Sequence, residues 1–353
     1  MREQSGERIT YLDLLRVISI FCMMMLHISA SQFDTTDVTS VSWQVFNVYD
    51  SMVRFCVPEF VMISGVFFLN PKRDYTLKKL WKNNILRIVT AYFFWAFCYA
   101  VGYTFVMNRT TDIAAFAGNV IKETFLGYYH LWFLNMIVGI YLVVPFLRKI
   151  AEDKKMTEYF ILLSFVTCYL GNLLRLVPVA GEVLDTVLSK SSLLLVAGYT
   201  GYFMAGYYFY TYDISKKFRH AVYALGALSL LATIAGTSAW SLAAGEARQA
   251  LYDYLLPTTC FVAWAIFLFF KSRVSGVNFS ERGSRQIAKL ASLSFGMYLV
   301  HEFFNIILKM LNITTLSFPA VISVPVLACV VFALSFVTAW VMSKIPFARK
   351  YLM

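Results

Sequence analysis

Residues 12–32 read LDLLRVISIFCMMMLHISASQ, and this apolar stretch indicates both the fold class and a possible chemistry. A helix needs about 20 apolar residues to cross a bilayer, which this stretch supplies. Arg16 and His27 interrupt it eleven positions apart. Because eleven residues make about three helical turns, both side chains lie on one face, roughly 16 Å apart along the axis. An arginine at membrane depth is costly, and histidine suits proton transfer, so the pair favours a function over a structural role.

The whole chain has the composition of a polytopic membrane protein. Of its 353 residues, 59% are hydrophobic and 14% are charged, whereas about 25% are charged in a typical soluble domain. We therefore predict an all-α integral membrane protein, with a single domain over residues 1–353 and a polar cavity inside the bundle. Ten apolar segments predict about ten transmembrane helices: 11–32, 48–69, 86–107, 131–149, 157–176, 193–211, 220–240, 251–270, 287–308 and 320–343.

The net charge of +11 follows the predicted topology. Lys and Arg alternate between rich and poor connecting segments, and the rich ones include 70–87 and 271–289. The positive-inside rule then places both termini in the cytoplasm. Segment 70–87 is also predicted to form a helix along the membrane interface before the third span. No nucleic-acid motif accompanies the basic residues, so the partner is the lipid bilayer and no nucleic acid is expected.

Other residues at membrane depth also predict a polar cavity: Asp13, Arg54, Glu59, Ser64, Asn135, Asn172, His301, Glu302 and Asn305. In the second span, Pro58 predicts an interruption, and Ser64-Gly65 permits close backbone approach. Glu59 is interpreted as a general base, a proton carrier or the ion-pair partner of an arginine. The six cysteines all lie within spans and lack metal-ligand spacing, so we predict packing residues and no metal site.

The candidate histidines each have a structural and a functional interpretation. His130, beside Trp132 at the outer boundary, is predicted to be solvated or helix-capping, with a site role as the alternative. His301, followed by Glu302, is either satisfied by a neighbour or in contact with substrate. For His27, a hydrogen-bonded core histidine is the alternative to a functional one. For Arg16, the alternative is a buried ion pair with Glu59.

Five motifs in order resemble the membrane-bound acyltransferase-3 family, part of the transmembrane acyltransferase superfamily. They are 12–16 with His27, matching the family's Arg-x10-His signature, then 57–65, 130–134 followed by 141–145, 201–207 and 298–301. The resemblance covers nearly the whole chain. It identifies a stand-alone member without the extracytoplasmic hydrolase-like domain that many members carry. Two positions depart from the family pattern: Asn84 replaces the first arginine of an Arg-x-x-Arg pair, and Glu59 stands where an apolar residue is common.

The resemblance implies an acyltransferase of the bacterial cytoplasmic membrane. An acyl group, often acetyl, would pass from cytoplasmic acyl-CoA, a co-substrate rather than a bound cofactor, to a hydroxyl of an envelope glycan or lipid-linked sugar. Arg87 and Asn84 are expected at the CoA phosphates, with Lys82 as the candidate for the missing charge. Arg16 would steady the thioester and His27 would act as general base or carry the acyl group.

The remaining candidates are assigned as substrate-binding or supporting residues: Glu59, Ser64, His130, Trp132, His301 and Glu302. The alternative function is a transporter of a small polar solute or an envelope glycan precursor. A transporter explains charged residues at membrane depth and a broken second helix equally well. It does not explain an arginine and an outward histidine on the same helix face.

Overall fold

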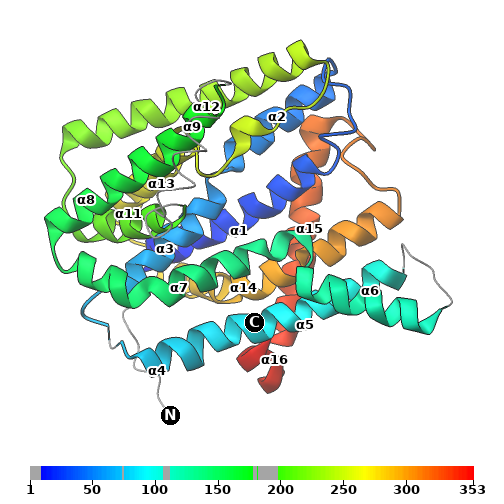
Figure 1. The fold of residues 1–353 in the computed structure, drawn as a ribbon, viewed down its shortest axis with the longest axis horizontal. Coiled ribbons are helices and arrows are strands. Elements are labelled where there is room, and N and C mark those ends of the chain that lie inside the picture. Colours follow the sequence, from blue (N-terminus) through cyan, green and yellow to red (C-terminus); the bar gives the residue numbers. More distant parts are fainter. Residues whose placement is uncertain (1–8, 74, 106–111, 178–180, 182–197) are drawn as a thin grey trace.

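The computed structural model describes residues 9–73, 75–105, 112–177, 181 and 198–353, and these ranges contain helices but no strand. Long helices run side by side in a bundle (Figure 1). The main ones are α1 (Thr10–Ala30), α2 (Val41–Val53), α3 (Cys56–Leu69), α5 (Leu86–Tyr103), α6 (Ile113–Leu126), α7 (Trp132–Ala151), α8 (Lys154–Ser164), α11 (Thr200–Thr211), α12 (Lys216–Ala244), α13 (Pro257–Phe269), α14 (Glu281–Met310) and α15 (Ala320–Met342). Shorter ones are α4 (Leu77–Lys79), α9 (Gly171–Arg175) and α16 (Pro346–Tyr351).

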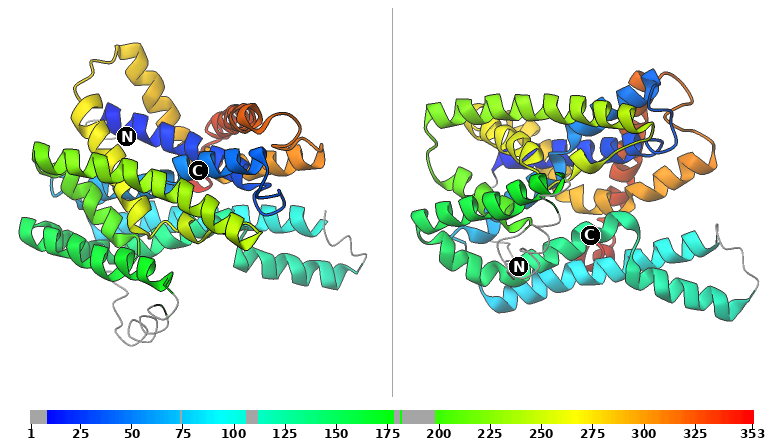
Figure 2. Two further views of the ribbon diagram at one scale, coloured as in Figure 1. Left: turned by 90° about the horizontal axis from the view of Figure 1, so that it is seen from above. Right: turned by 45° about the horizontal axis from the view of Figure 1, so that its top comes forward.

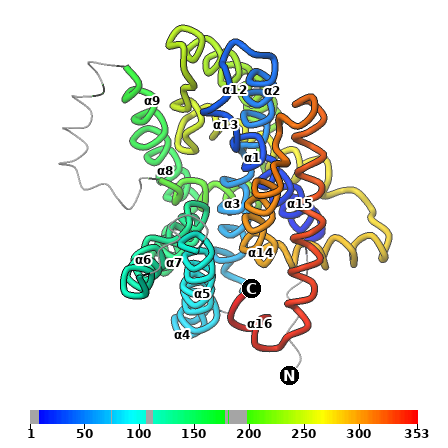
Figure 3. Tube along the Cα trace, turned by 90° about the vertical axis from the view of Figure 1, so that its right-hand side faces the viewer, coloured from blue at the N-terminus to red at the C-terminus, as the bar shows by residue number. Residues whose placement is uncertain are grey.

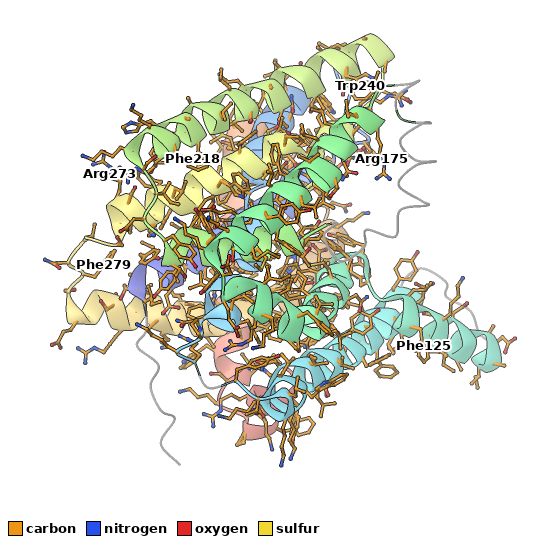
Figure 4. All side chains as sticks on the ribbon, turned by 60° about the vertical axis from the view of Figure 1, so that its left-hand side comes forward. Phe125, Arg175, Phe218, Trp240, Arg273 and Phe279 are labelled. Carbon is orange, nitrogen blue, oxygen red and sulfur yellow. The ribbon has the colours of Figure 1, made fainter. Side chains whose placement is uncertain are left out.

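Within the described ranges, nine helical segments are long and apolar enough to cross a membrane, which confirms the predicted fold class. They correspond to nine of the ten predicted spans. The sixth predicted span, 193–211, begins outside the described residues, and its second half forms α11. Large apolar side chains cover the outside of the bundle, including Phe125, Phe218 and Trp240 (Figure 4). Such a surface suits contact with lipid chains.

Helix α1 lies at the centre of the bundle. It packs against α2, α3, α14 and α15, and Figure 3 shows it among these helices when the bundle is viewed along its length. Its first turns, with Leu12 and Leu15, join one hydrophobic core with α3, α7, α11 and α13. Its last turns, with Met23 and Met24, join a second core with α2, α14 and α15. The polar side chains of α1 are therefore held inside the protein.

The second predicted span is interrupted, as its sequence predicts. Arg54 and Phe55 separate α2 from α3, and Pro58 is the third residue of α3. A proline is tolerated there because the first amides of a helix have no intrahelical acceptor. Further along α3, a Cβ atom at Gly65 would collide with the carbonyl oxygen of Phe203 on α11. The predicted close backbone approach at Ser64-Gly65 is thus confirmed, and it brings α3 and α11 into direct contact.

Segment 70–87 differs from its prediction. Instead of a separate helix before the third span, α4 and the π-helix η1 (Leu80–Ile85) continue directly into α5, so one helical segment extends from Leu77 to Tyr103. Figure 2 shows α5 and α6 extending past the rest of the bundle. Arg175 and Arg273, from connections predicted to be poor and rich in basic residues, lie at opposite ends of the bundle (Figure 4). A π-helix often marks a functional position, and η1 lies at the rim of the cavity described below.

Candidate active site

Four of the predicted site residues meet inside the bundle. They are His27 near the end of α1, His130 in the short helix η3 (Tyr129–Leu131), and His301 with Glu302 on α14. The ring of His301 is 5.0 Å from that of His27 and 5.1 Å from that of His130, between centroids. Tyr129 joins them through a hydrogen bond, and we call these five residues the histidine cluster. It gathers three of the four histidines of the chain.

Glu302 is the only carboxylate of the histidine cluster, and its side chain is 4% exposed. Asn305 Nδ2 donates a hydrogen bond to its Oε1 at 2.7 Å, and His301 Nε2 lies 3.3 Å from the same oxygen. His301 Nδ1 donates to the carbonyl oxygen of Tyr298 at 2.6 Å. This bond to the main chain turns the opposite ring nitrogen, Nε2, towards the Glu302 carboxylate. These contacts hold a buried charge in place.

His27 faces this carboxylate without reaching it. Its Nδ1 is 3.9 Å from Glu302 Oε1, which is beyond hydrogen-bond distance. The same nitrogen lies 3.2 Å from the hydroxyl of Tyr129. Tyr129 is absent from the residues predicted from sequence, because a tyrosine at a membrane boundary is ordinary. Its position directly before His130 was the available signal.

His130 corrects the prediction of a solvated or helix-capping residue. It is 1% exposed and packs edge-on against the rings of Tyr99 and Tyr298. Both ring nitrogens lack a hydrogen-bond partner among the described residues. Burial of unpaired nitrogens costs free energy, and such groups are uncommon in proteins. Because His130 lines a cavity, a bound molecule can supply the missing partner.

A cavity of about 380 Å³ connects the two residues of the opening motif. Its lining includes Arg16 and His27, so it extends along about three turns of α1, roughly 16 Å. This volume lies within the range of ligand pockets, about 300–1,000 Å³. Further predicted residues in its lining are Ser64, Asn84, Arg87, His130 and Trp132. A cavity lined by several of the predicted polar residues, with a largely apolar wall, is therefore present inside the bundle.

A second cavity, of about 340 Å³, also includes His27 in its lining. Its other lining residues include Tyr129, Glu302, Asn305 and Lys309. The imidazole of His27 therefore lies between two cavities, a largely apolar one that contains Arg16 and a more polar one that contains Glu302.

The basic end of the first cavity differs in detail from the prediction. Arg87 lines it, and its Nε donates to the main-chain oxygen of Met353 at 2.5 Å. Asn83 and Asn84 of η1 lie beside it. Lys82 is on the exposed face of η1 and lines neither cavity, so the structure does not bring it to the other predicted phosphate-binding residues. The neighbouring Asn83 and Asn84 are the η1 residues that line the cavity.

One interpretation of the sequence made Glu59 the ion-pair partner of Arg16 or Arg54. In the structure it pairs with neither. Arg16 Nη1 lies 4.0 Å from Asp13 Oδ1, and Arg54 Nε lies 2.5 Å from Asp50 Oδ1. The Glu59 side chain is fully buried and lines neither cavity. No cation pairs with it in the described ranges. A fully buried carboxyl without a cation is expected to be neutral.

The histidine cluster also contains a potential metal-ligand set, which the sequence did not predict. Ligand atoms of His27, His301 and Glu302 lie within 4.8 Å of one another. Two imidazoles and a carboxylate are donors that zinc accepts. A metal ion bound by these atoms would occupy a nitrogen of His27.

Comparison with known proteins identifies the family. The model of the acyltransferase domain of the acyltransferase-3 family matches residues 9–344. This range includes every residue that lines the two cavities. Neither the curated proteins nor the solved structures compared with the chain include a match. The chain therefore belongs to the acyltransferase-3 family and is a multi-pass membrane acyltransferase.

Proposed function

We propose that the protein transfers an acyl group, with acetyl expected, from cytoplasmic acyl-CoA to a hydroxyl of an envelope glycan or lipid-linked sugar. The reaction takes place in the bacterial cytoplasmic membrane, with both termini in the cytoplasm. The observation that carries the proposal is the position of His27 between two cavities of different chemistry. A base between two binding cavities can take the proton of an acceptor in one cavity as that acceptor meets a donor held in the other.

The first cavity fits the acyl donor. Its largely apolar wall suits the pantetheine arm and the acyl chain, while Arg16 lies along that path. Arg87, Asn83 and Asn84 lie at its rim, where cations and amides bind phosphate oxygens well. Arg87 is in a segment that the positive-inside rule places on the cytoplasmic side. A donor bound in this way brings its thioester towards His27.

The second cavity fits a polyhydroxylated acceptor. Gln32, Asn305 and Thr314 offer amide and hydroxyl groups, and Tyr128 offers an aromatic face. These side chains form the hydrogen bonds and ring contacts that sugars accept. By the same topology rule, this cavity opens towards the outer side of the membrane.

The chemistry is a direct acyl transfer. The acceptor hydroxyl attacks the thioester carbonyl, a C–O bond forms, and His27 takes the hydroxyl proton. The C–S bond breaks, and the CoA thiolate leaves with the proton that the imidazolium returns. The Glu302 carboxylate, 3.9 Å from His27 Nδ1, stabilises the imidazolium formed on the way. An acyl-His27 intermediate is the alternative, in which His27 itself attacks the thioester.

Radiolabelled acetyl-CoA tests this function. The purified protein in liposomes is mixed with envelope extract, and released CoA and label in glycans, lipids and protein are measured. We expect CoA release with label in the glycan or lipid fraction, and loss of both in His27→Ala. Acid-labile label on the protein after rapid quenching would assign the acyl-His27 route. Label transfer by a correctly folded His27→Ala variant would refute the role of His27, and solute uptake without CoA release would favour a transporter.

A further inference from the structure

We propose that Tyr129 is a positioning residue for acyl transfer: its hydroxyl accepts the Nδ1–H of His27, which leaves Nε2 of His27 as the basic nitrogen. This inference rests on the proposed function of His27. It assigns a role to a residue that neither the Arg-x10-His motif nor the family match distinguishes.

The geometry makes Tyr129 the hydrogen-bond partner of the base. The 3.9 Å between His27 Nδ1 and Glu302 Oε1 is too long for a hydrogen bond. The Tyr129 hydroxyl lies 3.2 Å from the same Nδ1. The rings of Tyr129 and His27 meet edge-on, with centroids 5.5 Å apart. The phenol, and not the carboxylate, therefore contacts Nδ1 directly.

The direction of this hydrogen bond follows from the proposed role of His27 as a base. Because the Tyr129 hydroxyl is bound to Nδ1, Nε2 is the ring nitrogen left to take a proton from the acceptor. A neutral imidazole with its lone pair on Nε2 carries its proton on Nδ1, so the Nδ1–H donates to the phenol oxygen. When Nε2 takes the acceptor proton, the positive charge faces the phenol oxygen and the Glu302 carboxylate 3.9 Å from Nδ1, while Tyr129 keeps its own proton.

Tyr92 on α5 provides a control outside both cavities. Its hydroxyl donates a hydrogen bond to the main-chain oxygen of Phe125 at 3.1 Å. That hydroxyl makes no hydrogen bond to the histidine cluster in the described residues. Removing it therefore costs one tyrosine hydrogen bond without touching His27.

Kinetics of Tyr129→Phe and Tyr92→Phe test the assignment on the full chain in liposomes. Loss of a residue that orients a reacting group costs about 10- to 100-fold in activity. We expect kcat for CoA release to fall by about that factor in Tyr129→Phe, with KM for acetyl-CoA within about twofold. Tyr92→Phe should remain within about twofold in both. Fluorinated tyrosines at position 129 should change kcat in step with the acidity of the phenol, which a packing role would not produce.

Unchanged kcat in Tyr129→Phe, or an equal loss in Tyr92→Phe, would overturn the proposal. A second measurement separates it from the acyl-transfer function. Diethylpyrocarbonate modifies the free imidazole nitrogen, and the two isomeric His27 adducts separate by chromatography before mass spectrometry. We expect one isomer in the wild type and two in Tyr129→Phe. If these isomers are found but no CoA is released, the acyltransferase proposal is refuted and the positioning role of Tyr129 stands. If both proteins give the same single isomer, only the positioning role of Tyr129 is refuted.

Discussion

Replacing Glu302 with glutamine keeps the shape of the side chain and removes the negative charge that lies 3.9 Å from His27 Nδ1. At about 4 Å and an effective dielectric constant of about 20, two unit charges attract with about 4 kcal/mol. This attraction exists only when His27 is an imidazolium, so its loss falls on the transition state. Because about 1.4 kcal/mol corresponds to a tenfold change in rate, kcat should fall by about three orders of magnitude.

The assay for Glu302→Gln is CoA release from acetyl-CoA by the purified protein in liposomes. Glu59→Gln is the matched control, since Glu59 is an equally buried carboxyl that lines neither cavity and has no cation beside it among the described residues. We expect its kcat to stay within about twofold. In a His27→Ala background, Glu302→Gln should add little, because paired residues are not additive. A kcat for Glu302→Gln within tenfold of the wild type would refute the electrostatic role, as would an equal loss in Glu59→Gln.

Three further perturbations test other parts of the molecule. Arg16→Ala should lower kcat/KM for acetyl-CoA by at least about tenfold, because it removes one charge-assisted hydrogen bond of about 1.5–3 kcal/mol. An unchanged dependence of the rate on acetyl-CoA would remove Arg16 from the donor path. Gly206→Ala should destabilise the fold by about 1–3 kcal/mol in thermal unfolding, because the new Cβ collides with the carbonyl of Met62, whereas Gly139→Ala meets no atom within 4 Å and should be neutral. Zinc should inhibit CoA release reversibly, with recovery on adding a chelator, and His301→Ala should weaken this inhibition; equal sensitivity of the variant would argue against binding in the histidine cluster.

Several candidate residues were predictable because polar groups at membrane depth are costly. Arg16, His27, His301 and Glu302 stand out in apolar segments for that reason alone. The sequence also placed the interruption near Pro58, because a proline inside a span removes a backbone hydrogen bond. These inferences need only local information, namely hydropathy, spacing and backbone chemistry.

Other assignments depended on the surroundings of each side chain. His130 looks like an interfacial residue until η3 folds against α14 and buries it. Tyr129 looks like one more boundary aromatic until its hydroxyl meets His27. Lys82 and Glu59 were predicted as site residues because they are charged. Lys82 lies on the exposed face of its helix, and Glu59 is fully buried.

The sequence by itself determined that this protein is an all-α membrane protein with an arginine and a histidine on one face of its first helix. Hydropathy and helical periodicity are properties of the chain alone. Only the tertiary structure decided which distant residues surround His27, because helix packing selects them. Close backbone contacts such as that between α3 and α11 set the positions of the helices. Those positions bring Tyr129, His301 and Glu302 to one imidazole, which no spacing within a single helix specifies.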